Sequence, residues 1–133
     1  MRRILVALLL AAGLLVSAWA GEHRMMNKSD LVPSATGKVE VNEDDNGNRV
    51  LKVRVYHLVD PERLNPARSG YMVWIEPKGK DPEPLGMLKV DKDWKGELEG
   101  TTPFKSFSVF VTAEENAKAE RPEGTEILRA ELD

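Results

Sequence analysis

The amino-acid sequence predicts an all-β protein, an immunoglobulin-like antiparallel β-sandwich of about seven strands. Three observations predict this fold class. Apolar and polar residues alternate with a period of two in several short segments. Gly, Pro, Asn and Asp separate these segments, and no segment keeps the 3.6-residue period of an amphipathic helix. Short strands divided by turn signals are typical of two packed antiparallel sheets.

The expected strands follow the chain from residue 36 to residue 132. Their ranges are 36–41, 50–58, 71–77, 85–90, 94–99, 104–112 and 125–132. In the third of them, the side chains of Tyr71, Val73 and Ile75 point to one side, while Met72, Trp74 and Glu76 point to the other. The 94–99 strand is polar, which is typical of a sheet edge. The residues expected to define the core are Tyr71, Trp74, Phe107, Val109 and Val111.

The first two strands are expected to form a hairpin, because Asn46-Gly47 tolerates the positive φ angles of a tight turn. The same segment resembles part of a calcium-binding loop, with Asn42, Asp44, Asn46 and Gly47 at positions 1, 3, 5 and 6. Position 12 of such a loop requires a bidentate glutamate, and Val53 stands there. The sequence therefore favours the hairpin.

Residues 1–20 have the pattern of a secretory signal peptide. Two arginines precede an apolar run over residues 4–16, and residues 18–20, Ala-Trp-Ala, supply the small-x-small pattern before a cleavage site. The run is short for a membrane span, which needs about 20 apolar residues; an uncleaved N-terminal anchor is the alternative interpretation. We expect cleavage between Ala20 and Gly21, or after Ala18, and a protein that is periplasmic or secreted and has no membrane span after processing.

Removing 20 of the 133 residues leaves 113, which is enough for one domain with its own core. Residues 21–35 lack a sustained period and predict a flexible leader, followed by the sandwich domain over residues 36–133. The signal carries two of the 19 basic residues and none of the 22 acidic ones, so the processed chain has 17 basic and 22 acidic residues and a net charge of −5. This balance argues against nucleic acid as a partner. The chain has no cysteine, so packing alone must stabilise it.

Cleavage after Ala20 would create a candidate metal site at the new N-terminus, Gly21-Glu22-His23. A free amine, two backbone amides and the His23 imidazole can surround copper(II) or nickel(II) in a square plane, the tetragonal nitrogen ligation that these ions prefer. Met25 and Met26 add thioethers, which suit copper(I). The alternative is that His23 is an ordinary solvated residue.

No catalytic signature is present in the sequence, and we expect a protein that is not an enzyme. His57 is the one histidine within the expected domain, and its position in the alternation places it on the buried face beside Val55. A structural role is favoured, since nucleophilic catalysis needs a base beside its nucleophile. Pairs of neighbouring carboxylates occur in the expected loops, and we interpret them as solvated surface groups rather than as catalytic pairs.

Several short segments follow one another in a recognisable order between residues 37 and 132. They are Leu58 with Pro61, Tyr71-Met72-Val73-Trp74, Pro84-Leu85-Gly86, the Gly96 region, residues 107–114 ending in Val111-Thr112-Ala113-Glu114, Pro122 with Gly124, and Ile127-Leu128. In this order they resemble the C-terminal extracytoplasmic domain of anti-sigma-K-type factors, which implies a small β-sandwich outside the cytoplasm. Full-length members of that family carry a sigma-binding domain and a membrane span ahead of this module. A signal peptide occupies that place here, and residues 115–119 replace a glycine-rich segment, so the resemblance does not extend to anti-sigma activity.

The expected function is that of an exported, non-catalytic envelope domain that binds an unknown envelope protein. The expected contact surface combines the loop over residues 78–84 with the loop over residues 113–124, since recognition residues on a rigid sandwich usually lie in loops. Two alternatives remain: metal handling through His23, and binding of a small ligand on the exposed ring of Trp94.

Overall fold

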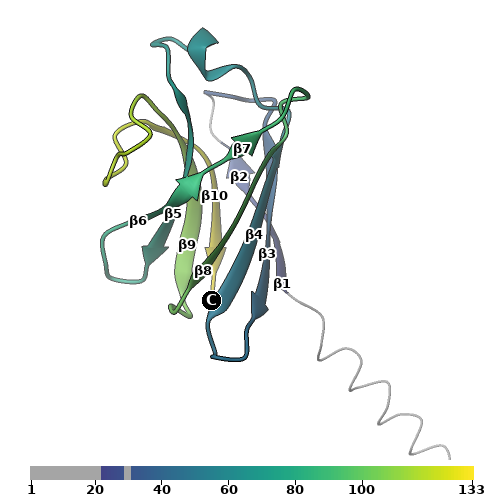
Figure 1. Ribbon diagram of the computed structural model, residues 1–133, viewed down its shortest axis with the longest axis vertical. Coiled ribbons are helices and arrows are strands. Elements are labelled where there is room, and N and C mark those ends of the chain that lie inside the picture. Colours follow the sequence, from purple (N-terminus) through teal and green to yellow (C-terminus); the bar gives the residue numbers. More distant parts are fainter. Residues whose placement is uncertain (1–21, 29–30) are drawn as a thin grey trace, which may run out of the picture.

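The computed structural model describes residues 22–28 and 31–133 and contains two five-stranded antiparallel sheets packed face to face (Figure 1). The predicted all-β sandwich is confirmed, with ten strands in the described part of the chain rather than about seven. The expected signal peptide and its cleavage site at Ala20 and Gly21 lie outside the described residues. Within the two described ranges, no helix has the length and apolarity needed to cross a membrane. A single 3₁₀ turn, η1 (Pro61–Arg63), interrupts the long connection between the sheets.

The first sheet has the strand order β1-β3-β4-β8-β7. Its strands are β1 (Glu22–Met25), β3 (Thr36–Glu43), β4 (Arg49–Tyr56), β7 (Lys89–Val90) and β8 (Gly96–Thr102). The predicted hairpin is confirmed, because β3 and β4 pair along their whole lengths. In its turn, the Asp44 carboxylate accepts the N–H groups of Asn46 and Asn48, and Gly47 has a φ of 79°.

The second sheet has the strand order β2-β10-β9-β5-β6. Its strands are β2 (Asn27–Lys28), β5 (Gly70–Pro77), β6 (Glu83–Met87), β9 (Phe107–Glu114) and β10 (Thr125–Leu132). A register shift between Glu126 and Leu128 interrupts the β9·β10 ladder. Such a β-bulge explains why Ile127 and Leu128 are both fully buried in one core, although strict alternation would place them on opposite faces.

Two segments change sheets and close the two sides of the sandwich. Residues 22–28 leave the first sheet as β1 and enter the second as β2, while residues 83–90 make the reverse change from β6 to β7. Met26 and Leu88 stand at the two crossing points, and each is 6% exposed. The Met26 N–H donates to the Gly37 carbonyl at 3.0 Å, and the Leu88 N–H donates to the Tyr71 carbonyl at 2.9 Å. Each crossing is thus fixed by a buried side chain and a backbone hydrogen bond.

The structure differs here from the flexible leader predicted over residues 21–35. β1 pairs with β3 over four residues, and Val32 and Ala35 are 1% and 0% exposed. The segment shows no sequence period because it changes sheets and contributes isolated anchors rather than one continuous face.

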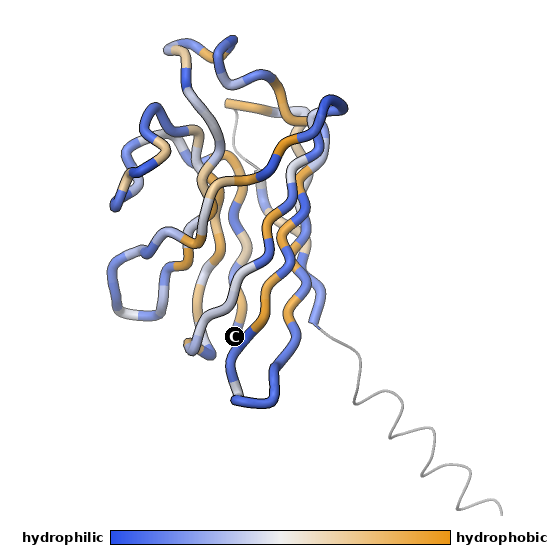
Figure 2. Tube along the Cα trace, in the orientation of Figure 1, coloured by the Kyte–Doolittle hydropathy of each residue, from blue (hydrophilic) through white to orange (hydrophobic). Residues whose placement is uncertain are grey.

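The core between the sheets contains Tyr71, Phe107, Val109 and Val111, as predicted, and alternating apolar and polar positions are visible along the strands in Figure 2. Trp74 is fully buried but does not belong to this core. It projects from the opposite side of β5, in a separate cluster on the outer face of the second sheet. The alternation in β5 was correctly predicted, but the inclusion of Trp74 in the core between the sheets was wrong.

Two further predictions need correction. β8 begins at Gly96 rather than residue 94, and it pairs with β4 on one side and β7 on the other, so it is not an edge strand throughout. His57 is exposed and has a φ of 59°, because β4 ends at Tyr56 and the left-handed residue turns the chain away from the strand alternation.

Candidate functional site

The outer face of the second sheet carries a row of three stacked side chains. Arg129 on β10, Phe110 on β9 and Trp74 on β5 are successive cross-strand partners. The Trp74 and Phe110 rings are 6.4 Å apart between centroids with an interplanar angle of 19°, and the Arg129 guanidinium carbon is 4.3 Å from the Phe110 centroid. These contacts combine aromatic stacking with a cation–π interaction.

A loop over residues 115–124 helps to bury this row. Its Ala119 is 5% exposed and packs in one cluster with Met72, Trp74 and Phe110, with Met87 from β6 at the margin. We call these five residues the outer cluster. In Figure 1 the loop is the yellow-green segment that connects β9 to β10, to one side of the strands. The loop therefore packs against an apolar cluster that is separate from the core between the sheets.

Buried Glu114 joins this loop to the sheet. Glu114 is 1% exposed, and its carboxylate accepts the backbone N–H groups of Gly124, at 3.0 and 3.1 Å, and of Glu123, at 3.2 Å. It also accepts the Thr112 hydroxyl, whose oxygen accepts the Trp74 indole N–H at 2.8 Å. A buried carboxylate is costly unless it is hydrogen-bonded, and here the donors are the end of the loop and the outer cluster.

The start of the same loop is held by the connection that precedes β5. The Ser69 N–H donates to the Glu114 carbonyl at 2.8 Å, and the Ser69 hydroxyl donates to the Glu115 carbonyl at 2.7 Å. Arg68 forms an ion pair with the Glu115 carboxylate at 3.3 Å. Since both ends of the loop are fixed, it presents its exposed residues in a defined arrangement.

Arg129 ties the outer cluster to its polar margin. Its guanidinium pairs with Glu126 at 2.7 Å and with Glu76 at 3.0 Å. The hydrogen bond with Glu126, supported by that with Glu76, raises the pKa of Arg129 above its ordinary value, while partial burial opposes the increase. The cation is therefore engaged by two carboxylates and an aromatic face.

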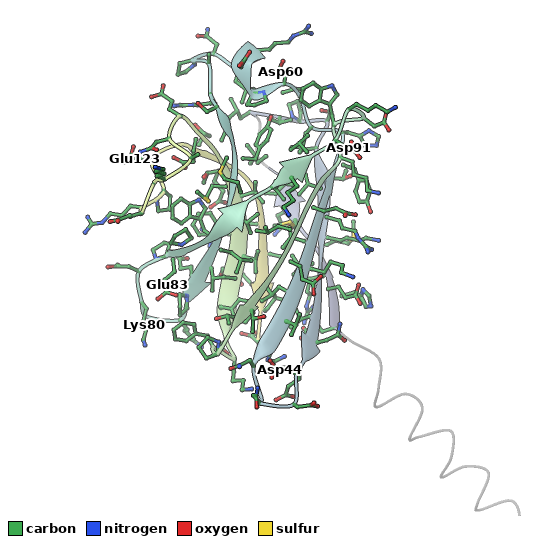
Figure 3. The ribbon with its side chains drawn as sticks, viewed as in Figure 1. Asp44, Asp60, Lys80, Glu83, Asp91 and Glu123 are labelled. Atoms are coloured by element: carbon green, nitrogen blue, oxygen red, sulfur yellow. The ribbon has the colours of Figure 1, made fainter. Side chains whose placement is uncertain are left out.

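Two hollows lie along this face. An open groove of about 620 Å³ runs between the turn after β5 and the ends of β9 and β10; its charged lining residues are Glu76, Lys78, Lys80, Asp81, Glu131 and Asp133. A smaller hollow of about 200 Å³ lies between Asp81 and Pro82 of one loop and Arg121 and Pro122 of the other. We call the two loops with these hollows the two-loop surface. Lys80, Glu83 and Glu123 mark its side of the molecule in Figure 3. The structure thus brings together residues of both loops that the sequence indicated for recognition.

The other residues considered from the sequence lie elsewhere. Trp94 is 38% exposed and lines a pocket formed with the connection after β4. His23 lies on β1 opposite Glu40, and Met26 is buried, so its thioether is not beside an exposed metal site.

The proposed copper or nickel site also meets a geometric constraint. Successive N–H groups of an antiparallel strand point alternately toward and away from the partner strand. Since Glu22 and His23 both pair with β3, one of the two amides that would ligate the metal points toward β3. Within residues 22–28 and 31–133, no group of three or more His, Cys, Asp or Glu side chains is arranged to hold a metal. Gly21 is outside the described residues, and the metal site stays a prediction.

Sequence reasoning missed Glu114. The available signal was the outward side of β9, where Phe110 and Thr112 precede Glu114 at alternate positions, opposite the outward Trp74 of β5. Two outward aromatics predict that something covers this face, and a carboxylate at the end of the same row would then be covered with them.

No protein-family model matches this chain, and the curated proteins contain no match to it.

Proposed function

We propose that the chain is an exported, non-catalytic binding module of the cell envelope, and that its two-loop surface binds an extended basic segment of another envelope protein. The observation that carries the proposal is the position of the loop over residues 78–82. Residues 78–81 line the open groove of about 620 Å³, and Asp81 and Pro82 also line the smaller hollow together with Arg121 and Pro122 of the other loop. Rigid loops lower the entropic cost of binding, because fewer side chains and backbone angles are ordered at the moment of association.

The charge of the groove favours a basic partner. Four of its six charged lining residues are acidic, and the processed chain would itself carry a net charge of −5. Glu76 is paired with Arg129, while Asp81, Glu131 and Asp133 are exposed acids. Charge complementarity of this kind increases the association rate and selects among partners.

A non-catalytic role is supported by the way in which the ionisable groups of this face are used. The Glu114 carboxylate is occupied by loop N–H donors and the Thr112 hydroxyl, and Arg129 is occupied by two carboxylates. Export is supported by the signal-like pattern of residues 1–20 and by the resemblance to an extracytoplasmic domain.

Site-specific photocrosslinking in the producing cells tests the interaction. A photoreactive amino acid at Lys80 or Arg121 should give the same discrete adduct, whereas the same group at Lys52, on the outer face of the first sheet, should not. Glu131→Lys should reduce the adduct yield about tenfold by reversing a groove charge, and Glu40→Lys serves as the matched control outside the surface. An adduct that forms equally well from Lys52, or no adduct from Lys80 and Arg121, would contradict the proposal.

Export has its own test. We expect the protein in the periplasmic or secreted fraction. Its intact mass should correspond to a chain that begins at Gly21 or, after the alternative cleavage, at Trp19. A full-length protein that remains in the cytoplasm would contradict the proposed location.

A further inference from the structure

A second pocket lies at one end of the sandwich, away from the two-loop surface. It has a volume of about 500 Å³ and is lined by Leu31, Leu58, Val59, Asp60, Arg63, Leu64 and Trp94. This size is within the range of small-molecule sites. Asp60 and Asp91, which belong to the loops around the pocket, lie at one end of the molecule in Figure 3, and Asp44 lies at the other. We call this site the end pocket.

The backbone at Trp94 is held in an unusual conformation. Its φ of 57° is in the left-handed region, which is unfavourable for a bulky side chain. The turn is fixed because the Asp91 carboxylate accepts the N–H groups of Asp93 and Lys95, the Trp94 N–H donates to the Asp91 carbonyl, and the Trp94 carbonyl accepts the Leu58 N–H. A glycine would occupy this turn without strain. The indole is instead held at the pocket with 38% of the residue exposed.

The lining of the end pocket favours an apolar ligand body over a sugar. Four aliphatic side chains adjoin Trp94, whereas a sugar would need polar groups to bind its hydroxyls. The Val59 carbonyl already accepts the Tyr71 hydroxyl at 2.7 Å, and an Asp60 oxygen accepts the Glu62 N–H at 3.0 Å. Burial raises the pKa of Tyr71 to about 12, against the opposing effect of its hydrogen bond to Val59, so this hydroxyl remains a donor at neutral pH.

The pocket also has an available cation. Arg63 is exposed at the pocket and forms no ion pair with any residue in the described ranges. Its guanidinium fork suits a carboxylate or a similar oxyanion. Asp60 also lies in the lining, but one of its oxygens is used to cap η1.

We propose that the end pocket binds a small anionic amphiphile, whose alkyl or aryl body lies against Trp94 and the aliphatic lining and whose anionic head pairs with Arg63. This site is independent of the proposed protein-binding surface. Either proposal can fail without affecting the other.

Calorimetric titration with decanoate, a ten-carbon carboxylate, and with decyltrimethylammonium, which has the same chain length and the opposite charge, tests the proposal below micellar concentrations. Decanoate should bind the wild-type protein at least tenfold more tightly than the cation. Trp94→Gly, which suits the left-handed backbone, should weaken decanoate binding about tenfold or more while circular dichroism shows an intact β-fold. Arg63→Gln should remove the preference for the anion.

Lys92→Gln is the matched control, because it removes a cation from the neighbouring turn without changing the pocket lining. It should bind decanoate as the wild type does. Equal binding of the two amphiphiles to the wild-type protein would overturn the assignment of an anionic ligand. Absence of decanoate binding, or unchanged binding after Arg63→Gln, would overturn the proposed site even if Trp94→Gly fails to fold.

Discussion

The outer faces of the two sheets contrast in composition and in what covers them. On the first sheet, cross-strand neighbours form charged rows that remain partly or fully exposed; two of these rows are Glu40-Lys52-Glu99 and Lys38-Arg54-Glu97. On the second sheet, Trp74 and Phe110 occupy the corresponding outward positions and are 0% and 4% exposed. One face meets water directly, and the other requires a cover.

This difference explains why one loop of the protein is fixed. A charged face is stable in water without further structure, whereas an apolar face gains stability when it is removed from water. Residues 115–124 provide part of that cover, and buried Glu114 holds the loop in place through its N–H donors. The apolar outer face of the second sheet is thus covered in part by a loop that is fixed at both ends. Recognition residues usually lie on loops that a rigid scaffold holds in place.

Trp74→Ala should produce the largest loss of stability. Removing a fully buried indole from the outer cluster should lower the free energy of unfolding by about 3–5 kcal/mol, since it leaves a cavity and removes the indole N–H that donates to the Thr112 hydroxyl. Tyr56→Ala, on the partly exposed outer face of the first sheet, should cost about 1 kcal/mol. Urea denaturation of both variants measures the difference, and equal losses would show that the two faces do not differ energetically.

Glu114→Gln should have the next largest effect. The substitution replaces one of two acceptor oxygens by an NH₂ donor. The Gly124 N–H and the Thr112 hydroxyl cannot both keep the acceptors that they have in the wild type, so stability should fall by about 1–3 kcal/mol. Amide hydrogen exchange in residues 115–124 should accelerate more than in β3 and β4. Glu115→Gln is the control, because its exposed carboxylate makes a single ion pair with Arg68; similar exchange in both variants would argue against the role of Glu114.

The contrast between the two outer faces also shows which features of the fold could be predicted from the sequence and which could not. Strict alternation identified the main strands and the inward positions of Tyr71, Val109 and Val111, because burial on one side of a strand imposes a period of two. Alternation cannot say whether the other side is covered, since that depends on where a distant loop packs. The outer position of Trp74 and the burial of Glu114 were missed for this reason.

The edges of the sandwich were harder to predict for a different reason. β1 and β2 are held by separate anchors at Met26, Val32 and Ala35, which leave no periodic pattern. Likewise, the single expected strand over residues 85–90 is divided between two sheets at Leu88. The end pocket depends on the left-handed backbone of Trp94, and the residue type gives no indication of that conformation, which is rare for tryptophan.

Arg129→Gln should lower the stability moderately. Together with Arg54→Gln, it compares charged groups on the outer faces of the two sheets. The substitution removes a cation–π contact and two ion pairs at a partly buried guanidinium, and should cost about 1 kcal/mol. Arg54→Gln removes the 3.5 Å pair with Glu97 on the first sheet and should cost about 0.3 kcal/mol or less. Thermal unfolding of both variants under the same buffer conditions provides the test, and a larger loss for Arg54→Gln would reverse the expected order.

Lys52→Glu should have the smallest effect and shows how the charged face is stabilised. The substitution places a glutamate between Glu40 and Glu99, its direct partners on β3 and β8, and like charges at such positions repel one another. The expected loss is about 0.5 kcal/mol at low salt, and it should shrink at 1 M salt, where the screening length is about 3 Å. The Trp74→Ala loss should persist at both salt concentrations because it arises from packing. A salt-independent loss in Lys52→Glu would mean that this side chain stabilises the first sheet through its aliphatic stem rather than through its charge.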